Sequence, residues 1–114
     1  MFGEVLPLLA EGRQVIAVDL QAHGRTADTD RSLRYESMGD DIGGLIQHLG
    51  FAKADVMGYS LGAGTALRTA IQHPDLVRKL VVVSTPFKLT WCESWWLFRR
   101  PSSAMAGIPK LSRV

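Results

Sequence analysis

Residues 54–72 read ADVMGYSLGAGTALRTAIQ, and this stretch decides the fold. Its first six residues form a short apolar run typical of a buried strand. Residues 61–72 have a helical composition, and Pro74 marks the exit from that helix. The turn between them, residues 58–62, reads GYSLG and matches the pattern G-x-S-x-G. A serine on a sharp turn from strand to helix is the context in which this pattern presents a nucleophile.

Each position of the GYSLG turn has a physical reason. Gly58 and Gly62 are expected because side chains two residues before and after the nucleophile would collide with neighbouring backbone. Ser60 is the expected nucleophile, with its Oγ exposed at the carboxyl end of the strand. Leu61 begins a helix whose first amides and positive dipole end face a developing oxyanion. Its N–H is therefore the expected oxyanion donor.

The flanking sequence predicts alternating strands and helices. Residues 14–19 and 80–83 are apolar, β-branched runs typical of strands buried on both faces. Residues 35–49 place apolar side chains at helical spacing, and tertiary packing must hold this helix because it contains three glycines. Residues 2–10 read as the end of an earlier helix, with Gly12 as its stop. The order predicts an α/β fold with three parallel strands and crossover helices in three layers.

The glycines allow a second interpretation. Gly58, Gly62 and Gly64 fit the spacing of short-chain dehydrogenases, whose loop receives a cofactor pyrophosphate at a helix N-terminus. That loop normally follows the first strand of its domain, whereas a strand and a helix precede it here. The Tyr-x-x-x-Lys pair of that class is also missing, since glycine and alanine stand four residues after the two tyrosines. A nucleotide-binding dehydrogenase is therefore a minor alternative.

Four stretches together make the chain resemble the α/β-hydrolase family. They are residues 15–25 (VIAVDLQAHGR), 35–49, the turn at 58–62, and 73–83 (HPDLVRKLVVV). The resemblance covers about residues 1–87 and implies that three segments are the fourth, fifth and sixth strands of that fold, namely 14–19, 54–59 and 80–84. In that family a third strand lies between the fourth and the fifth, and it is not among these stretches. Unpaired strand edges would therefore give the chain a surface for self-association.

The resemblance implies a serine hydrolase that acts on carboxylic esters or related acyl substrates through an acyl-enzyme, with no cofactor. A serine nucleophile argues against the dehalogenase and epoxide-hydrolase branches, while lactone, peptide and carbon–carbon hydrolysis stay open. The family needs an acid and then a histidine after Ser60, but the acids there are Asp75 and Glu93. The histidine, His73, lies about 20 Å along the helix from the serine. A catalytically silent chain, acting as a binding or assembly piece, is thus the main alternative.

The remaining polar candidates receive structural interpretations. His23 is expected to organise a loop, and His48 to lie on the surface near a helix end. Asp19 and Asp55 are expected to cap or end strands. Cys92 is the single cysteine and cannot form an internal disulfide, and the three scattered histidines give no metal-ligand spacing.

Composition excludes several classes and indicates a boundary. The chain has 114 residues and a formal net charge of +2, with no apolar run near the roughly 18 residues of a membrane span and no secretion signal. We expect a cytoplasmic protein with a small-molecule substrate and neither membrane nor nucleic-acid partners. Residues 1–87 carry a net charge of −2, and residues 88–114 carry +4 and all three tryptophans. The prediction is a partial α/β-hydrolase core over 1–87 and a basic, Trp-rich tail over 88–114.

Overall fold

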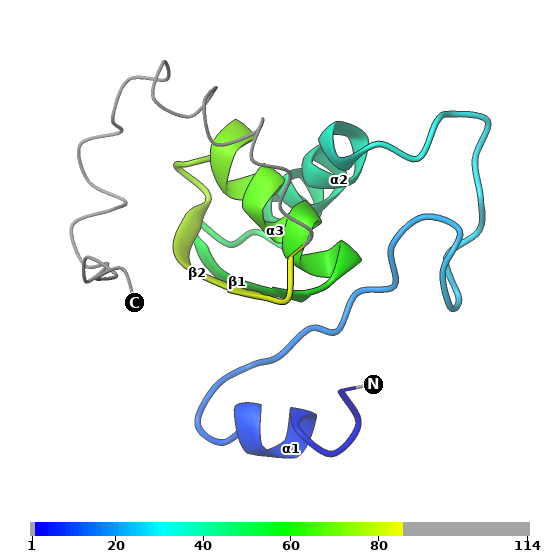
Figure 1. Ribbon diagram of the computed structural model, residues 1–114. Helices are drawn as coiled ribbons and strands as arrows, with labels where there is room; N and C mark the ends of the chain where they lie inside the picture. Colours follow the sequence, from blue (N-terminus) through cyan, green and yellow to red (C-terminus); the bar gives the residue numbers. More distant parts are fainter. Residues whose placement is uncertain (1, 86–114) are drawn as a thin grey trace, which may run out of the picture. The chain divides into compact units, whose positions relative to one another are not determined.

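The computed structural model describes residues 2–85, which divide after Asp30 into unit 1 (residues 2–30) and unit 2 (residues 31–85). The boundary expected near residue 87 and the tail beyond it lie outside the described residues. The helices and strands follow one another along the chain as Figure 1 labels them: α1 Leu6–Leu9, α2 Tyr35–His48, β1 Ala54–Tyr59, α3 Leu61–Gln72 and β2 Val77–Val83.

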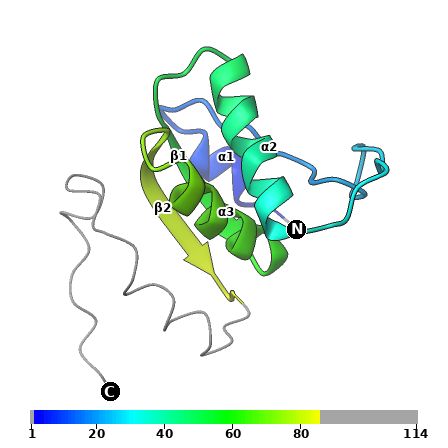
Figure 2. The same ribbon diagram turned by 90° about the horizontal axis from the view of Figure 1, so that it is seen from above.

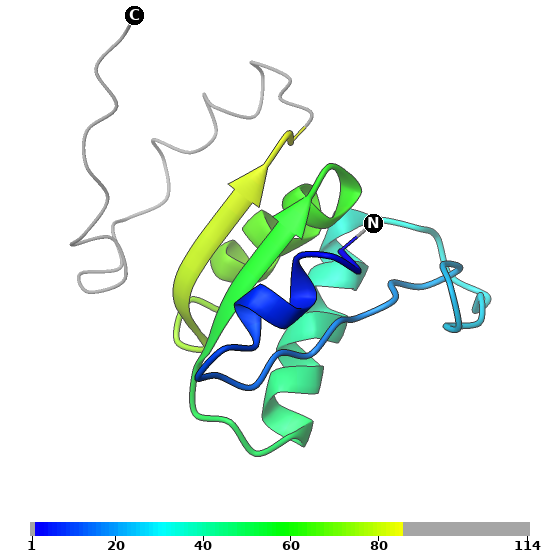
Figure 3. The ribbon, with the colours of Figure 1, turned by 90° about the horizontal axis from the view of Figure 1, so that it is seen from below.

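Unit 2 is an α/β arrangement built on two parallel strands. β1 and β2 pair from Ala54 opposite Val77 to Tyr59 opposite Val83, and Figure 3 shows them side by side and pointing the same way. Because parallel neighbours need a crossover, α3 connects the two strands and packs against both. α2 packs on α3, and the two helices lie next to each other in Figure 2. The predicted α/β class is confirmed.

Most element boundaries in unit 2 agree with the sequence prediction. β1 and α3 have the predicted bounds. α2 ends at His48, one residue before the predicted Leu49, and Gly50, at φ 76°, follows Leu49. β2 begins three residues earlier than expected, at Val77. The sequence did not indicate this start because the charged residues Arg78 and Lys79 interrupt the apolar run. Both of their side chains are exposed, whereas Val77 is only 6% exposed.

Two glycines of α2 let it approach α3 closely. A Cβ on Gly39 would lie 3.2 Å from the Thr69 nitrogen, and a Cβ on Gly43 would lie 2.6 Å from the His73 ring. Tertiary packing therefore holds this glycine-containing helix, as predicted. The buried apolar residues of the described chain all belong to unit 2: Met38, Ile46, Ala63, Ala66 and Val77.

The strand predicted at residues 14–19 is wrong, because this segment has no strand assignment and Ile16 and Val18 are 45% and 44% exposed. A strand requires ladder hydrogen bonds to a neighbour. In the described residues β1 and β2 pair only with each other, and no segment takes the place of the family's third strand. Over residues 2–85 the sheet therefore has two strands in place of the predicted three.

Unit 1 is held by short-range polar bonds. α1 is followed by a turn, and Gly12 adopts φ 72°, which fits its predicted role as a helix stop. In the loop after residue 18, the Asp19 carboxylate accepts a hydrogen bond from the Arg25 amide at 3.1 Å. The side chain of Gln21, only 3% exposed, donates to the Asp28 carboxylate at 2.8 Å.

Candidate active site

The turn between β1 and α3 holds Ser60 in an uncommon backbone conformation. Ser60 has φ 52° and ψ −114°, outside the regions that residues with a Cβ normally occupy. Its N–H donates to the Val83 carbonyl of β2 at 3.0 Å, and its own carbonyl accepts from Ala63 at 3.0 Å and Gly64 at 3.2 Å. Bonds to two different elements therefore hold the strained residue.

The side chain of Ser60 does not cap the helix that it precedes. Serine at this position commonly accepts a hydrogen bond from an amide of the first turn, but Ser60 makes no side-chain cap bond and is exposed. The amides of Leu61 and Gly62 precede the first hydrogen-bonded turn of α3, so they have no acceptor within the helix. An exposed hydroxyl and helix-end amides thus occur within three consecutive residues.

The two glycines of the motif differ in their surroundings. A Cβ on Gly58 would overlap the Gly62 carbonyl and lie 2.6 Å from the Ala63 nitrogen, so only glycine fits there, as expected. A Cβ on Gly62 would meet nothing within 4 Å among the described residues, so the expectation of a collision at Gly62 is wrong. The chain turns so that the backbone at Gly62 passes over Gly58. Of the two glycines, only Gly58 must therefore lack a side chain.

Neither His73 nor Asp75 lies near the start of α3. His73 follows the last residue of that helix, which is about 18 Å long at 1.5 Å per residue, and Asp75 stands in the turn beyond it. The His73 Nε2 lies within hydrogen-bond distance of the Asp40 carboxylate of α2, at 2.8 Å. This geometry agrees with the sequence argument that His73 is too far from Ser60 to act as its base.

The remaining candidates are His23, His48 and Asp55. The His23 Nδ1 lies 2.7 Å from the Gln21 carbonyl in the loop of unit 1, and His48 is exposed in the last turn of α2. Asp55 accepts two bonds from Arg78 of the neighbouring strand, at 2.8 and 3.0 Å. The hydrogen bonds and charge of Asp55 raise the pKa of the Arg78 guanidinium. His23 thus organises its loop and His48 lies on the surface, as the sequence indicated, and Asp55 bridges to the neighbouring strand.

The described residues contain neither a metal-binding cluster nor a membrane-spanning helix. No cluster of three or more histidine, cysteine or acidic side chains in residues 2–85 could hold a metal ion. Within the same part of the chain, no helix combines the length and apolar character required to cross a bilayer.

Sequence reasoning overlooked one contact at this turn. Gly64 lies under the ring of Tyr35, because a Cβ there would come within 2.8 Å of the Tyr35 Cζ. The sequence offered a weak signal, since a second glycine in the first turn of a helix costs helix propensity and calls for a packing reason. It gave no indication of the partner.

Residues 1–103 match the family described as alpha/beta hydrolase fold, and the chain therefore belongs to the α/β-hydrolase family. Among its relatives, the sn-1-specific diacylglycerol lipase ABHD11 of Mus musculus is 40% identical over 72 residues, which are 63% of this chain and 23% of that protein. The 2-(acetamidomethylene)succinate hydrolase of Mesorhizobium japonicum is 34% identical over 88 residues, 76% of this chain and 32% of that protein.

A solved structure supports the same fold. The epoxide hydrolase CorEH without ligand has a TM-score of 0.68 and 29% identity, over 75% of this chain and 34% of that chain. The chain thus spans between 23% and 34% of the lengths of these three proteins. The family assignment favours the hydrolase interpretation of the glycine-rich turn over the nucleotide-binding one.

Proposed function

We propose that this chain carries the nucleophile of a serine hydrolase acting on carboxylic esters or related acyl substrates. The observation that carries the proposal is the backbone of Ser60, at φ 52° and ψ −114° between β1 and α3. Strained conformations of this kind persist only where the surroundings hold them, and they cluster at functional sites. A serine on such a turn is the geometry of a nucleophile elbow.

The proposed roles follow from the contacts around Ser60. Its Oγ, which makes no cap bond, attacks the substrate carbonyl, and the proton passes to a general base. The tetrahedral intermediate carries negative charge on the former carbonyl oxygen, and the Leu61 N–H donates to it. The base gives this proton to the leaving oxygen, so that the alcohol departs and leaves an acyl-enzyme, which water then hydrolyses. Gly58 allows the backbone crossing that the turn requires.

The nature of the nucleophile supports an acyl substrate. An attacking serine yields an ester intermediate that water cleaves at its carbonyl carbon, which suits carboxylic esters. Two relatives have names consistent with this chemistry: the diacylglycerol lipase of the mouse and a putative esterase/lipase of Haemophilus influenzae, which is 30% identical over 81 residues. The epoxide hydrolase similarity supports the fold.

One observation favours a second candidate, a chain that does not turn over substrate. Within residues 2–85, His73 is paired with Asp40 at the far end of α3, and His48 is exposed at the end of α2. His23 belongs to the other unit and is bonded within its own loop. Within unit 2, neither His48 nor His73 is therefore placed as a base for Ser60.

A phosphonylating probe distinguishes the two candidates. The purified chain is incubated with a fluorophosphonate, and the mass gain and its site are determined by mass spectrometry. We expect one adduct at Ser60, its loss in Ser60→Ala, and its retention in Ser84→Ala. Ser84 is a matched control because it is exposed, follows β2 directly and also has positive φ, at 55°.

A second readout separates reactivity from turnover. Hydrolysis of a short-chain activated ester by the wild-type chain and by Ser60→Ala is followed under the same conditions. Turnover lost in the variant supports the enzyme. A wild-type chain that neither reacts with the probe nor exceeds the variant in hydrolysis contradicts the proposed function and supports the silent chain.

A further inference from the structure

The contacts between α2 and α3 keep the same order along both helices. Met38 meets Thr65, with Sδ and Oγ1 3.9 Å apart, Gly39 approaches Thr69, and Gly43 approaches the ring of His73. The sequence separation between partners stays near 30 throughout. The two helices therefore run in the same direction, and the first residue of α2, Tyr35, lies beside the first turn of α3.

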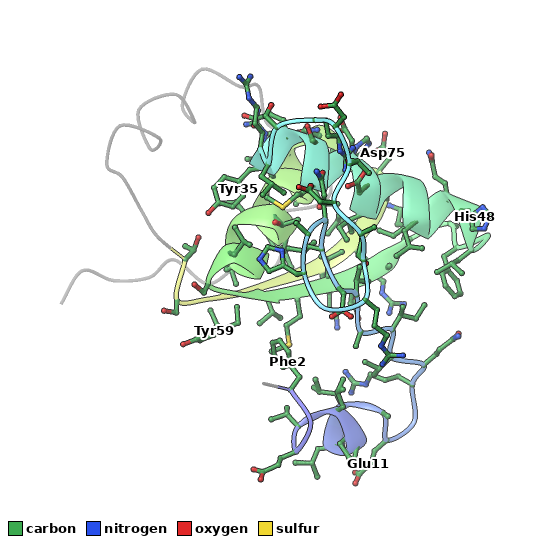
Figure 4. All side chains as sticks on the ribbon, turned by 90° about the vertical axis from the view of Figure 1, so that its right-hand side faces the viewer. Phe2, Glu11, Tyr35, His48, Tyr59 and Asp75 are labelled. Atoms are coloured by element: carbon green, nitrogen blue, oxygen red, sulfur yellow. The ribbon has the colours of Figure 1, made fainter. Side chains whose placement is uncertain are left out.

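The ring of Tyr35 covers that first turn closely. A Cβ on Gly64 would lie 2.8 Å from the ring Cζ and 3.1 Å from Cδ1, so the ring lies directly against the Gly64 backbone. Figure 4 shows Tyr35 at the same end of unit 2 as Tyr59, the residue before Ser60, and far from His48. An aromatic side chain from another helix thus packs on the turn that begins at Ser60.

The covered backbone is the part that holds the Ser60 carbonyl. Gly64 and Ala63 both donate to this carbonyl, at 3.2 and 3.0 Å, while the Ser60 N–H is held on the other side by Val83. A strained residue relaxes when one of its restraints moves. The Tyr35 ring blocks one direction in which the first turn of α3 could move.

We propose that Tyr35 is a positioning residue that holds the first turn of α3, and with it the backbone of Ser60, in the elbow conformation. It acts through packing on Gly64 and touches no reacting atom. Its effect on the reactivity of Ser60 rests on the function proposed above. Its effect on the turn itself does not.

Amide hydrogen exchange tests the effect on the turn. In Tyr35→Ala we expect exchange of the Ala63 and Gly64 amides to rise about tenfold relative to the end of α3, because the ring no longer restrains that turn. Tyr35→Phe retains the ring and restores wild-type exchange. Gly43→Ala disturbs the same helix interface at its far end, where the added Cβ meets His73, and leaves exchange at residues 63–64 unchanged relative to the wild type.

A second variant covers the case in which Tyr35→Ala does not fold. Gly64→Ala keeps the tyrosine but displaces its ring from the turn, and we expect the same local rise in exchange. Unchanged exchange at positions 63 and 64 in the folded variants, or an equal rise in Gly43→Ala, overturns the proposal.

Probe labelling tests the consequence for Ser60. We expect fluorophosphonate labelling to slow about tenfold in Tyr35→Ala and to recover in Tyr35→Phe. An equal labelling rate in wild type and Tyr35→Ala overturns the proposed effect on reactivity. A wild-type chain that is not labelled contradicts the proposed hydrolase, while the exchange comparison still decides the role of Tyr35 in the turn.

Discussion

Residues 14–19 of unit 1 and residues 54–59 of unit 2 are two short apolar runs of equal length with different outcomes. The second is β1, paired along its length with β2. The first has no strand assignment, and its Ile16 and Val18 are exposed. The comparison teaches that an apolar, β-branched run supplies the preference for a strand, whereas a neighbouring ladder decides whether the strand forms.

The two units are also stabilised by different kinds of contact. In unit 2, backbone and side chains about 30 residues apart meet at glycines, as Gly39 does with Thr69. In unit 1, hydrogen bonds join residues close in sequence, such as Asp19 with Arg25 and Gln21 with Asp28. Unit 2 should therefore respond strongly to changes in packing, and unit 1 to changes in polar partners.

The largest expected effect is at Gly58. In Gly58→Ala the new Cβ overlaps the Gly62 carbonyl, and backbone cannot move aside as a flexible side chain can. We expect a loss of about 3 kcal/mol or more in the free energy of unfolding, measured by chemical denaturation. Gly62→Ala is the matched control, because its Cβ meets nothing among the described residues. We expect its free energy of unfolding to rise by up to about 1 kcal/mol. Equal losses in the two variants would contradict the one-sided crossing described here.

A substitution made once in each unit tests the difference in packing. Val77 in β2 is 6% exposed and Val18 in unit 1 is 44% exposed. We expect Val77→Ala to lower the free energy of unfolding by about 2 kcal/mol and Val18→Ala by less than about 0.5 kcal/mol. Denaturant titration of both variants measures the difference. A comparable loss from Val18→Ala would show that residues 14–19 are buried in a way that contradicts their exposure here.

Much of unit 2 could be predicted because its signals are local. The apolar stripe of α2, Gly50 after it, and the glycine-serine-glycine turn before α3 each lie within a few residues of the feature that they specify. The position of Ser60 between β1 and α3 followed from the same signals, and its role as nucleophile stays a prediction. The start of β2 was missed because Arg78 and Lys79 interrupt the apolar pattern, although Val77 pairs with Ala54 and Lys79 with Asp55, across a register shift at Arg78.

The rest depends on contacts between distant segments, which no local pattern contains. The fate of residues 14–19 depends on a partner strand. Gly58 must be glycine because the Gly62 carbonyl lies where a Cβ would stand, whereas the Cβ position of Gly62 is open. Which of the two glycines is required thus depends on how the turn brings their backbones together. The packing of Tyr35 on Gly64 depends on the direction in which α2 crosses α3, and periodicity predicts that a helix has an apolar face but not what covers it.

The smallest expected effect concerns the loop of unit 1 and is read from pH dependence. The hydrogen bond from Gln21, followed by that from the Thr29 amide, lowers the pKa of the Asp28 carboxyl. A lowered carboxyl pKa stabilises the folded loop above the unfolded pKa of about 3.9, and this contribution is lost as pH falls through the folded pKa. Gln21→Ala should therefore raise the pKa of Asp28 toward its ordinary value, and its destabilisation should shrink on acidification below about pH 4.

Titration of the Asp28 carboxyl carbon by NMR checks this shift in wild type and Gln21→Ala. Gln47→Ala is the matched control, since it removes the same side chain from an exposed position of α2 in the other unit. An Asp28 titration that does not move in Gln21→Ala would mean that the Gln21 bond does not lower the pKa. The loop of unit 1 would then depend on its other hydrogen bonds, such as that from the Arg25 amide to the Asp19 carboxylate, and the role given to the Gln21 side chain in the contrast with the closely packed unit 2 would be lost.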